Sequence, residues 1–90
     1  MKVKQLISKK SGNPIANQFI ITTDKGLYFQ SYNSIICFID KTNDKIYLDP
    51  SYWNYSKTTS KYRNQFLNTN SQEINKLINS GIIKWKNLNS

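Results

Sequence analysis

The sequence predicts a small α+β domain in which an antiparallel sheet of four to six strands carries two helices, both from the C-terminal half, on one face. Three observations lead to this class. Alternating apolar and polar residues, typical of strands, occupy most of residues 3–48. Helical spacing and helix-capping residues begin only after Asp49-Pro50. A chain of 90 residues fits one domain, so residues 1–90 are expected to fold as a single unit.

The strands of the first half are separated by residues that favour turns. A weak strand over residues 3–8 ends at the turn-forming segment 11–14, and residues 15–23 alternate regularly. Asp24-Lys25-Gly26 fits a three-residue hairpin in which Gly26 takes the left-handed position. Further strands are expected over residues 27–32, 34–40 and 45–48, with a polar turn or bulge at 30–34 that aims Tyr32 or Asn33 outward.

The segment 34–40 is apolar on both faces, which predicts an interior strand covered on both sides. Cys37 lies within it and is interpreted as a small buried hydrophobic residue. Because both faces of this strand are apolar, a homodimer is also possible, in which a second copy of the chain covers one of the two faces.

Two helices are predicted after the strands. Pro50 to Trp53 fits one short helical turn, and Ser56 fits the N-cap of a helix that runs to about Leu67. Thr59, Tyr62 and Phe66 have the spacing of its buried stripe.

The second helix begins at Asn70, because Glu73 completes a pattern resembling a capping box. Ile74, Leu77 and Ile78 form its apolar face and Gly81 ends it. Residues 82–86 alternate and are predicted to add a last strand.

The composition excludes most catalytic and metal-binding chemistry. The chain has no histidine and a single cysteine, so it lacks the usual general base, an internal disulfide and the ligands of a structural zinc site. We therefore expect a protein that is not an enzyme and has no catalytic residue, metal, cofactor or small-molecule substrate. No apolar stretch is long enough to cross a bilayer or to form a signal peptide, so we expect no membrane partner and a reducing cytoplasm.

The net charge of +8 is unevenly distributed along the chain. Residues 1–23 contain four lysines and no acid, and residues 74–90 contain three lysines and no acid. Four of the five acids lie in residues 24–49. This asymmetry favours an anionic partner, although the abundance of Lys, Asn and Ile also fits an AT-rich genome.

The densest run of polar functional side chains lies around the first predicted helix. Lys57, Lys61 and Asn64 are expected along one face of it, next to the arc of the buried stripe. This face is interpreted either as an ordinary solvated surface or as a site for a phosphate backbone. The exposed aromatic residues are interpreted either as stacking platforms for unpaired bases or as core, with Tyr28 and Tyr47 on the solvent side. The candidate binding residues are Lys57, Lys61, Arg63, Asn64, Tyr55, Tyr32, Lys84 and Lys86.

Three segments resemble a family of small proteins from tailed bacteriophages. They are Ala16-Asn17-Gln18-Phe19-Ile20-Ile21, Tyr28-Phe29-Gln30-Ser31-Tyr32-Asn33-Ser34, and the run from Tyr52 to Leu67. The resemblance covers residues 13–68 and leaves 69–90 outside. It implies a viral origin and action in the host cytoplasm, and it implies no established activity.

Two functions follow as expectations. The first is a phage protein that binds nucleic acid, or the nucleic-acid-handling part of a host defence complex such as a CRISPR system, through a basic face. The alternative is a protein–protein inhibitor that docks on a host enzyme through exposed aromatic residues and Arg63, since Trp, Tyr and Arg dominate binding hot spots. An enzyme is the third alternative.

Overall fold

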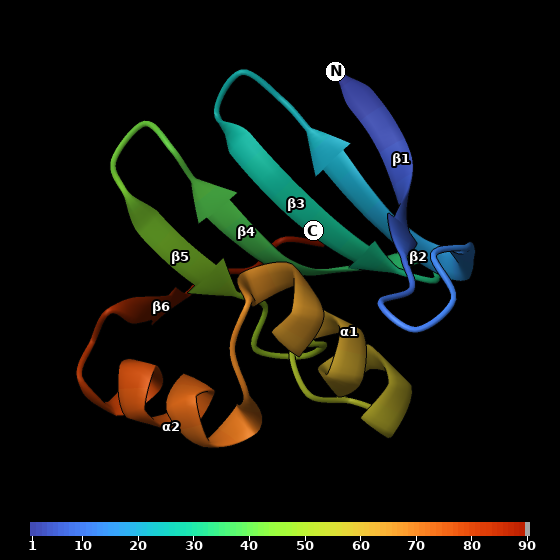
Figure 1. Ribbon diagram of the computed structural model, residues 1–90. Coiled ribbons are helices and arrows are strands. Elements are labelled where there is room, and N and C mark those ends of the chain that lie inside the picture. Colours follow the sequence, from blue (N-terminus) through green and yellow to red (C-terminus); the bar gives the residue numbers. More distant parts are fainter. Residues whose placement is uncertain (90) are drawn as a thin grey trace.

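The computed structural model describes residues 1–89, in which five strands are followed along the chain by two helices and a last short strand, and the six strands form one sheet (Figure 1). The small α+β class predicted from the sequence is thereby confirmed. The elements are β1 (Lys2–Ile7), β2 (Pro14–Thr22), β3 (Gly26–Ser31), β4 (Ser34–Asp40), β5 (Lys45–Leu48), α1 (Lys57–Leu67), α2 (Ser71–Asn79) and β6 (Ile83–Trp85).

The strands lie in the sheet in the same order as in the chain, from β1 at one edge to β6 at the other. Strands β1 to β5 pair antiparallel, whereas β6 pairs parallel with β5. This pair is parallel because the segment with the two helices returns the chain from the end of β5 to the end of the sheet at which β5 begins. The sheet is therefore mixed, and only its first five strands match the antiparallel arrangement that the sequence predicted.

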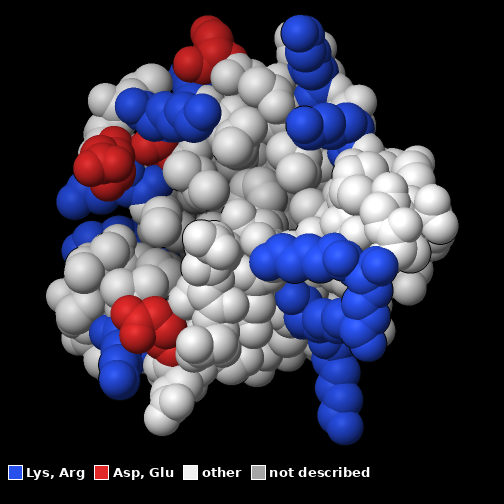
Figure 2. All heavy atoms as spheres, viewed as in Figure 1, with Lys and Arg blue, Asp and Glu red and all other residues white. Residues whose placement is uncertain are grey.

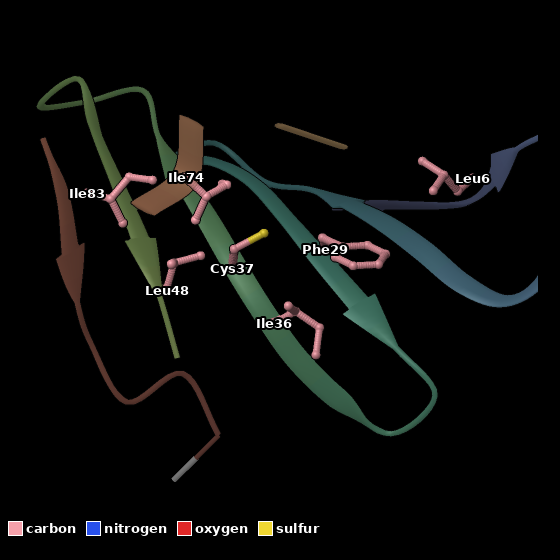
Figure 3. Packing of buried hydrophobic residues seen from close by; sticks show 7 residues of the cluster. All are labelled: Leu6, Phe29, Ile36, Cys37, Leu48, Ile74 and Ile83. Atoms are coloured by element: carbon pink, nitrogen blue, oxygen red, sulfur yellow. The ribbon is translucent and has the colours of Figure 1, made fainter. Parts of the chain in front are cut away.

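The main core lies between the helices and one face of the sheet. Helix α1 packs against β3 and β4, and α2 packs against β6. Figure 3 shows Cys37, Leu48 and Ile83, from three neighbouring strands, around Ile74 of α2. Cys37 is fully buried, and its burial raises the pKa of the thiol far above the ordinary value. The thiol therefore stays protonated and acts as a small hydrophobic side chain, as predicted.

The face of the sheet without helices carries a row of stacked aromatic rings. Tyr28, Phe38 and Tyr47 are register partners on β3, β4 and β5. The ring centroids of Tyr28 and Phe38 are 4.2 Å apart, and those of Phe38 and Tyr47 are 6.2 Å apart. Phe38 is consequently only 3% exposed. The two-sided apolarity of β4 is satisfied within one chain, so it gives no reason to expect a homodimer.

Both helices begin at the predicted N-caps. The Ser56 hydroxyl accepts a hydrogen bond from the Thr59 amide at 3.0 Å, and the Asn70 side chain accepts one from the Glu73 amide at 2.8 Å. Thr59 is fully buried, and Tyr62 and Phe66 pack against the core cluster. The predicted stripe of α1 therefore faces the sheet. No helix within residues 1–89 has the length and apolarity needed to span a membrane.

Asp49 joins the turn before α1 to the C-terminal segment. Its carboxylate accepts hydrogen bonds from the amides of Ser51 and Tyr52 through one oxygen and from the Leu88 amide through the other. Burial by itself would raise the pKa of Asp49, but these bonds outweigh it and hold the pKa below the ordinary value. A carboxyl group with a lowered folded-state pKa stabilises the fold above its unfolded pKa, and this stabilisation disappears as the pH falls through the folded value.

We expect Asp49→Asn to lower the free energy of unfolding at pH 7 by about 2 kcal/mol, because the new amide nitrogen faces the Leu88 donor. The stability of the variant should also decrease less than that of the native protein when the pH falls below about 4, because position 49 no longer has a carboxyl group to protonate. Urea unfolding between pH 7 and pH 3 measures both effects. Asp44→Asn is the control, because Asp44 is exposed and has a positive φ that asparagine tolerates. Equal stability of the two variants at pH 7 would contradict this role of Asp49.

Candidate nucleic-acid interface

A groove of about 180 Å³ separates the β1–β2 loop from α1. This basic groove is lined by Ser8, Lys9, Lys10, Lys61, Tyr62 and Gln65. Three of its six lining residues are lysines and the other three carry hydroxyl or amide groups. Most of the lining surface is formed by carbon atoms of these side chains, and their ammonium, hydroxyl and amide groups bring to it the positive charge and hydrogen-bond donors that bind phosphate oxygens.

Both walls of the basic groove are held by hydrogen bonds. The Ser8 hydroxyl accepts bonds from the amides of Lys10 and Ser11, each at 3.3 Å, which fixes the loop that carries the lysines. The Gln65 side chain donates to the carbonyl oxygen of Ile7 at 2.7 Å, which ties α1 to the end of β1. The lysines thus project from a fixed backbone, and the Lys61 ammonium lies 5.2 Å from the centroid of the Tyr62 ring.

The charge around the basic groove is of one sign. None of its described lining residues is acidic. Figure 2 shows basic side chains without carboxylates on the side of the molecule that carries α1 and β1, whereas the carboxylates in this view lie toward the hairpin tips and α2. Positive charges without neighbouring carboxylates raise the local concentration of anions.

A family model described as a family of unknown function (DUF8033) matches residues 1–81 of the 90. The chain belongs to this family. No curated protein and no solved structure matches the chain. The match includes both walls of the basic groove. The family description carries neither an activity nor a source, so the phage origin stays a prediction.

One of the eight predicted binding residues of this DUF8033 protein lines the basic groove, and three more are exposed on α1, just before it, or in the turn held beside its start. Lys61 lines it, and Lys57 is exposed one turn earlier on α1. Tyr55 precedes this helix and is 53% exposed, and Tyr32 lies in the β3–β4 turn and is 45% exposed. A hydrogen bond of 3.1 Å between the hydroxyls of Ser31 and Thr59 brings that turn to the start of α1.

Arg63 corrects the sequence prediction, because the side chain is buried and only 1% exposed. Its guanidinium donates to the carbonyl oxygen of Trp53 at 2.6 Å and to the side-chain oxygens of Asn54 and Asn64. It also lies over the Trp53 ring, 5.3 Å from the centroid. Burial lowers the pKa of Arg63 from its ordinary value. In this DUF8033 protein Arg63 joins α1 to the preceding turn and does not face a partner.

Asn64 also differs from the expected exposed residue, because its side chain is engaged within the protein. Its oxygen accepts from the Arg63 guanidinium, and its nitrogen donates to the Ser71 hydroxyl at the start of α2 at 3.0 Å. Asn64 therefore links the two helices, and its amide group has bonding partners before any ligand arrives.

Lys84 and Lys86 lie away from the basic groove. Lys84 is on β6, at the sheet edge opposite β1, and is the register partner of Tyr47. The Lys86 ammonium lies 5.3 Å from the centroid of the Tyr47 ring. These two lysines belong to the helix-free face, so the basic residues at the two ends of the chain do not form one surface.

The sequence prediction missed the loop lysines Lys9 and Lys10. The signal available was the excess of lysine without any acid in residues 1–23. The closeness of these two lysines to Lys61 depends on the tertiary contact between Gln65 and Ile7, which are 58 positions apart in the chain, so no local pattern predicts it.

Proposed function

We propose that this protein binds nucleic acid through the basic groove, by contacts to the phosphate backbone, and that it acts by binding and not by catalysis. The observation that carries the proposal is the meeting of Lys9, Lys10 and Lys61 on two hydrogen-bonded walls, with no carboxylate among the described residues of the lining. Lysine ammonium groups bind phosphate as point charges and release its counterions on contact.

The polar residues of the basic groove support the same ligand. The Tyr62 hydroxyl stands beside Lys61 and is able to donate a hydrogen bond to a phosphate oxygen, and the Gln65 amide has one N–H left for the same purpose after its bond to the Ile7 carbonyl oxygen. The Tyr62 ring also packs against the core, so its position is fixed before a ligand binds. A preformed set of donors loses little conformational entropy on binding.

The two most buried reactive groups support a role in binding over one in catalysis. Cys37 is fully buried with a raised thiol pKa, so it is not available as a thiolate nucleophile. Asp49 is 1% exposed and both of its carboxylate oxygens accept hydrogen bonds. Both side chains are committed to the fold.

We expect the combined substitutions Lys9→Gln, Lys10→Gln and Lys61→Gln to weaken nucleic-acid binding and to reduce its dependence on salt. Each lost phosphate contact removes about 0.7–0.9 from the slope of log K against log salt, so the slope becomes shallower by about two to three. Fluorescence anisotropy with labelled 20-mers, single-stranded and duplex, between about 50 and 200 mM salt measures the change.

The matched control carries the same change in net charge away from the basic groove. Lys25, Lys41 and Lys45 lie at the two hairpin tips, in the connections or at the strand ends next to them, together with Asp24, Asp40 and Asp44. Replacing these three lysines by glutamine should leave the salt slope nearly unchanged. If both triple variants lose equal affinity, or if the native protein binds neither ligand at about 50 mM salt, the proposed function is wrong.

The setting in which the protein acts is proposed from the phage resemblance alone. In that setting the nucleic acid belongs to the host or to a host defence complex such as a CRISPR system, and binding occurs in the host cytoplasm. Affinity capture from infected cells, with and without nuclease, tests this setting. A partner that is retained after nuclease treatment and in about 0.5 M salt would favour the alternative, in which the protein docks on a host enzyme.

A further inference from the structure

We infer that the nucleic acid bound at the basic groove is single-stranded, and that Tyr32 and Tyr55 stack on its unpaired bases. The inference rests on the proposed function and narrows its ligand. Base–aromatic stacking requires a free ring beside a cationic track and a base whose face is not covered by a neighbour. A duplex would meet the lysines but would offer no base face to the two tyrosines.

Most aromatic rings of the chain are already occupied by neighbours within the fold. Three of them form the row on the helix-free face, and Phe29 stacks on Phe66 in the core. Trp53 lies between the Arg63 guanidinium and an edge contact with Trp85. The exposed aromatic residues are Tyr32, Tyr55 and Trp85. Of these, Trp85 is on β6, and only the two tyrosines lie near the lysines of α1.

The two tyrosines lie on segments next to the start of the helix that carries Lys57 and Lys61. The hydrogen bond between Ser31 and Thr59 holds the β3–β4 turn, which carries Tyr32, beside the first turn of α1, and Tyr55 lies two residues before Lys57. Lys61 follows one turn later, about 6 Å along the helix axis, and lines the basic groove. A strand bound along α1 would place its phosphates on the lysines and its bases near the tyrosines.

Tyr32 has a backbone conformation that is unfavourable for its side chain. Its φ is +56°, a region in which glycine or asparagine costs less than tyrosine. The backbone is held there from both sides, since its amide donates to the Asn17 carbonyl oxygen and its own carbonyl accepts from the Gln30 side chain, each at 2.7 Å. A strained residue with an exposed ring favours a function for the ring, and an exposed ring of this kind is able to stack on an unpaired base.

Tyr55 is also set on a fixed support. The preceding Asn54 accepts hydrogen bonds from Ser60 at 2.7 Å and from Arg63 at 3.2 Å, and the following Ser56 caps α1. The Tyr55 ring makes an edge contact with Tyr52, with the ring planes at 88°. An edge contact does not stack a second ring on Tyr55, and more than half of this side chain stays exposed.

The test compares oligo(dT) and oligo(U) of 20 nucleotides with a 20-base-pair duplex, by anisotropy at about 50 mM salt. The first variant combines Tyr32→Asn with Tyr55→Ala. Asparagine tolerates the positive φ of position 32, so this variant is expected to fold, which thermal melting checks. The control combines Tyr32→Phe with Tyr55→Phe, which keeps both rings.

We expect the first variant to bind the single strands at least about tenfold more weakly and the duplex within about twofold of the native protein. The phenylalanine control should bind both as the native protein does. Unchanged affinity for the single strands, or an equal loss for the duplex, overturns this inference and leaves the proposed function standing. A native protein that binds none of the three ligands overturns the proposed function as well.

Discussion

An Arg63→Ala variant is expected to lose about 3–5 kcal/mol of unfolding free energy. The substitution removes a large buried side chain and leaves the Trp53 carbonyl oxygen without its 2.6 Å donor. It also leaves the side-chain oxygens of Asn54 and Asn64 without the guanidinium. A chain of this size has a total stability of about 5–13 kcal/mol, so the variant should be close to unfolding at 37 °C.

Chemical denaturation followed by circular dichroism measures the loss, with Arg63→Lys and Lys61→Ala as comparisons. Lysine keeps the charge but cannot reach Trp53, Asn54 and Asn64 with one planar group, so it should restore little of the stability. Lys61 is exposed, and its replacement should change stability by less than about 0.5 kcal/mol. If Arg63→Ala is as stable as Lys61→Ala, the buried role of Arg63 is wrong.

Helical spacing places Arg63 on the buried side of α1, whereas its residue type favours exposure. Thr59 belongs to the predicted buried stripe, and Arg63 lies four residues later, on the same arc of the helix. Arginine is almost never fully buried without partners, so exposure was the natural expectation. The partners here are two asparagines and a carbonyl oxygen of the preceding turn, and no sequence pattern indicated that this turn folds back onto α1.

Local signals were sufficient for most of the fold. Alternation, turn residues and capping residues act over a few positions, and they located the strands of the first half and the starts of both helices. The parallel pairing of β6 depends on how two helices cross the sheet, which no local pattern encodes. Alternation also failed within β2, where Asn17 has a φ of +65° and Ile15 packs against the core.

Local patterns predicted only the part of the candidate site that lies on one helix. Lys57 and Lys61 were expected together because one helix fixes their spacing. Lys9 and Lys10 reach Lys61 only through the tertiary contact between the β1–β2 loop and α1. Lys84 and Lys86 were grouped with them on the basis of charge, but six strands in chain order place β6 at the far edge of the sheet.

Gly26→Ala is expected to lower the unfolding free energy by about 3 kcal/mol or more, because a Cβ at this position collides with the backbone carbonyl of Ile39. The positive φ expected from the hairpin is present, but at +155° it is not the left-handed helical conformation, and close packing against β4 is the stronger constraint. Relief would require β3 and β4 to separate where the Lys41 amide bonds to Lys25. Gly12→Ala is the matched control, since its φ is +74° and open space surrounds it, so it should lose only about 1–2 kcal/mol. Urea unfolding measures both variants, and equal losses would show that backbone conformation, and not the contact with β4, requires glycine at position 26.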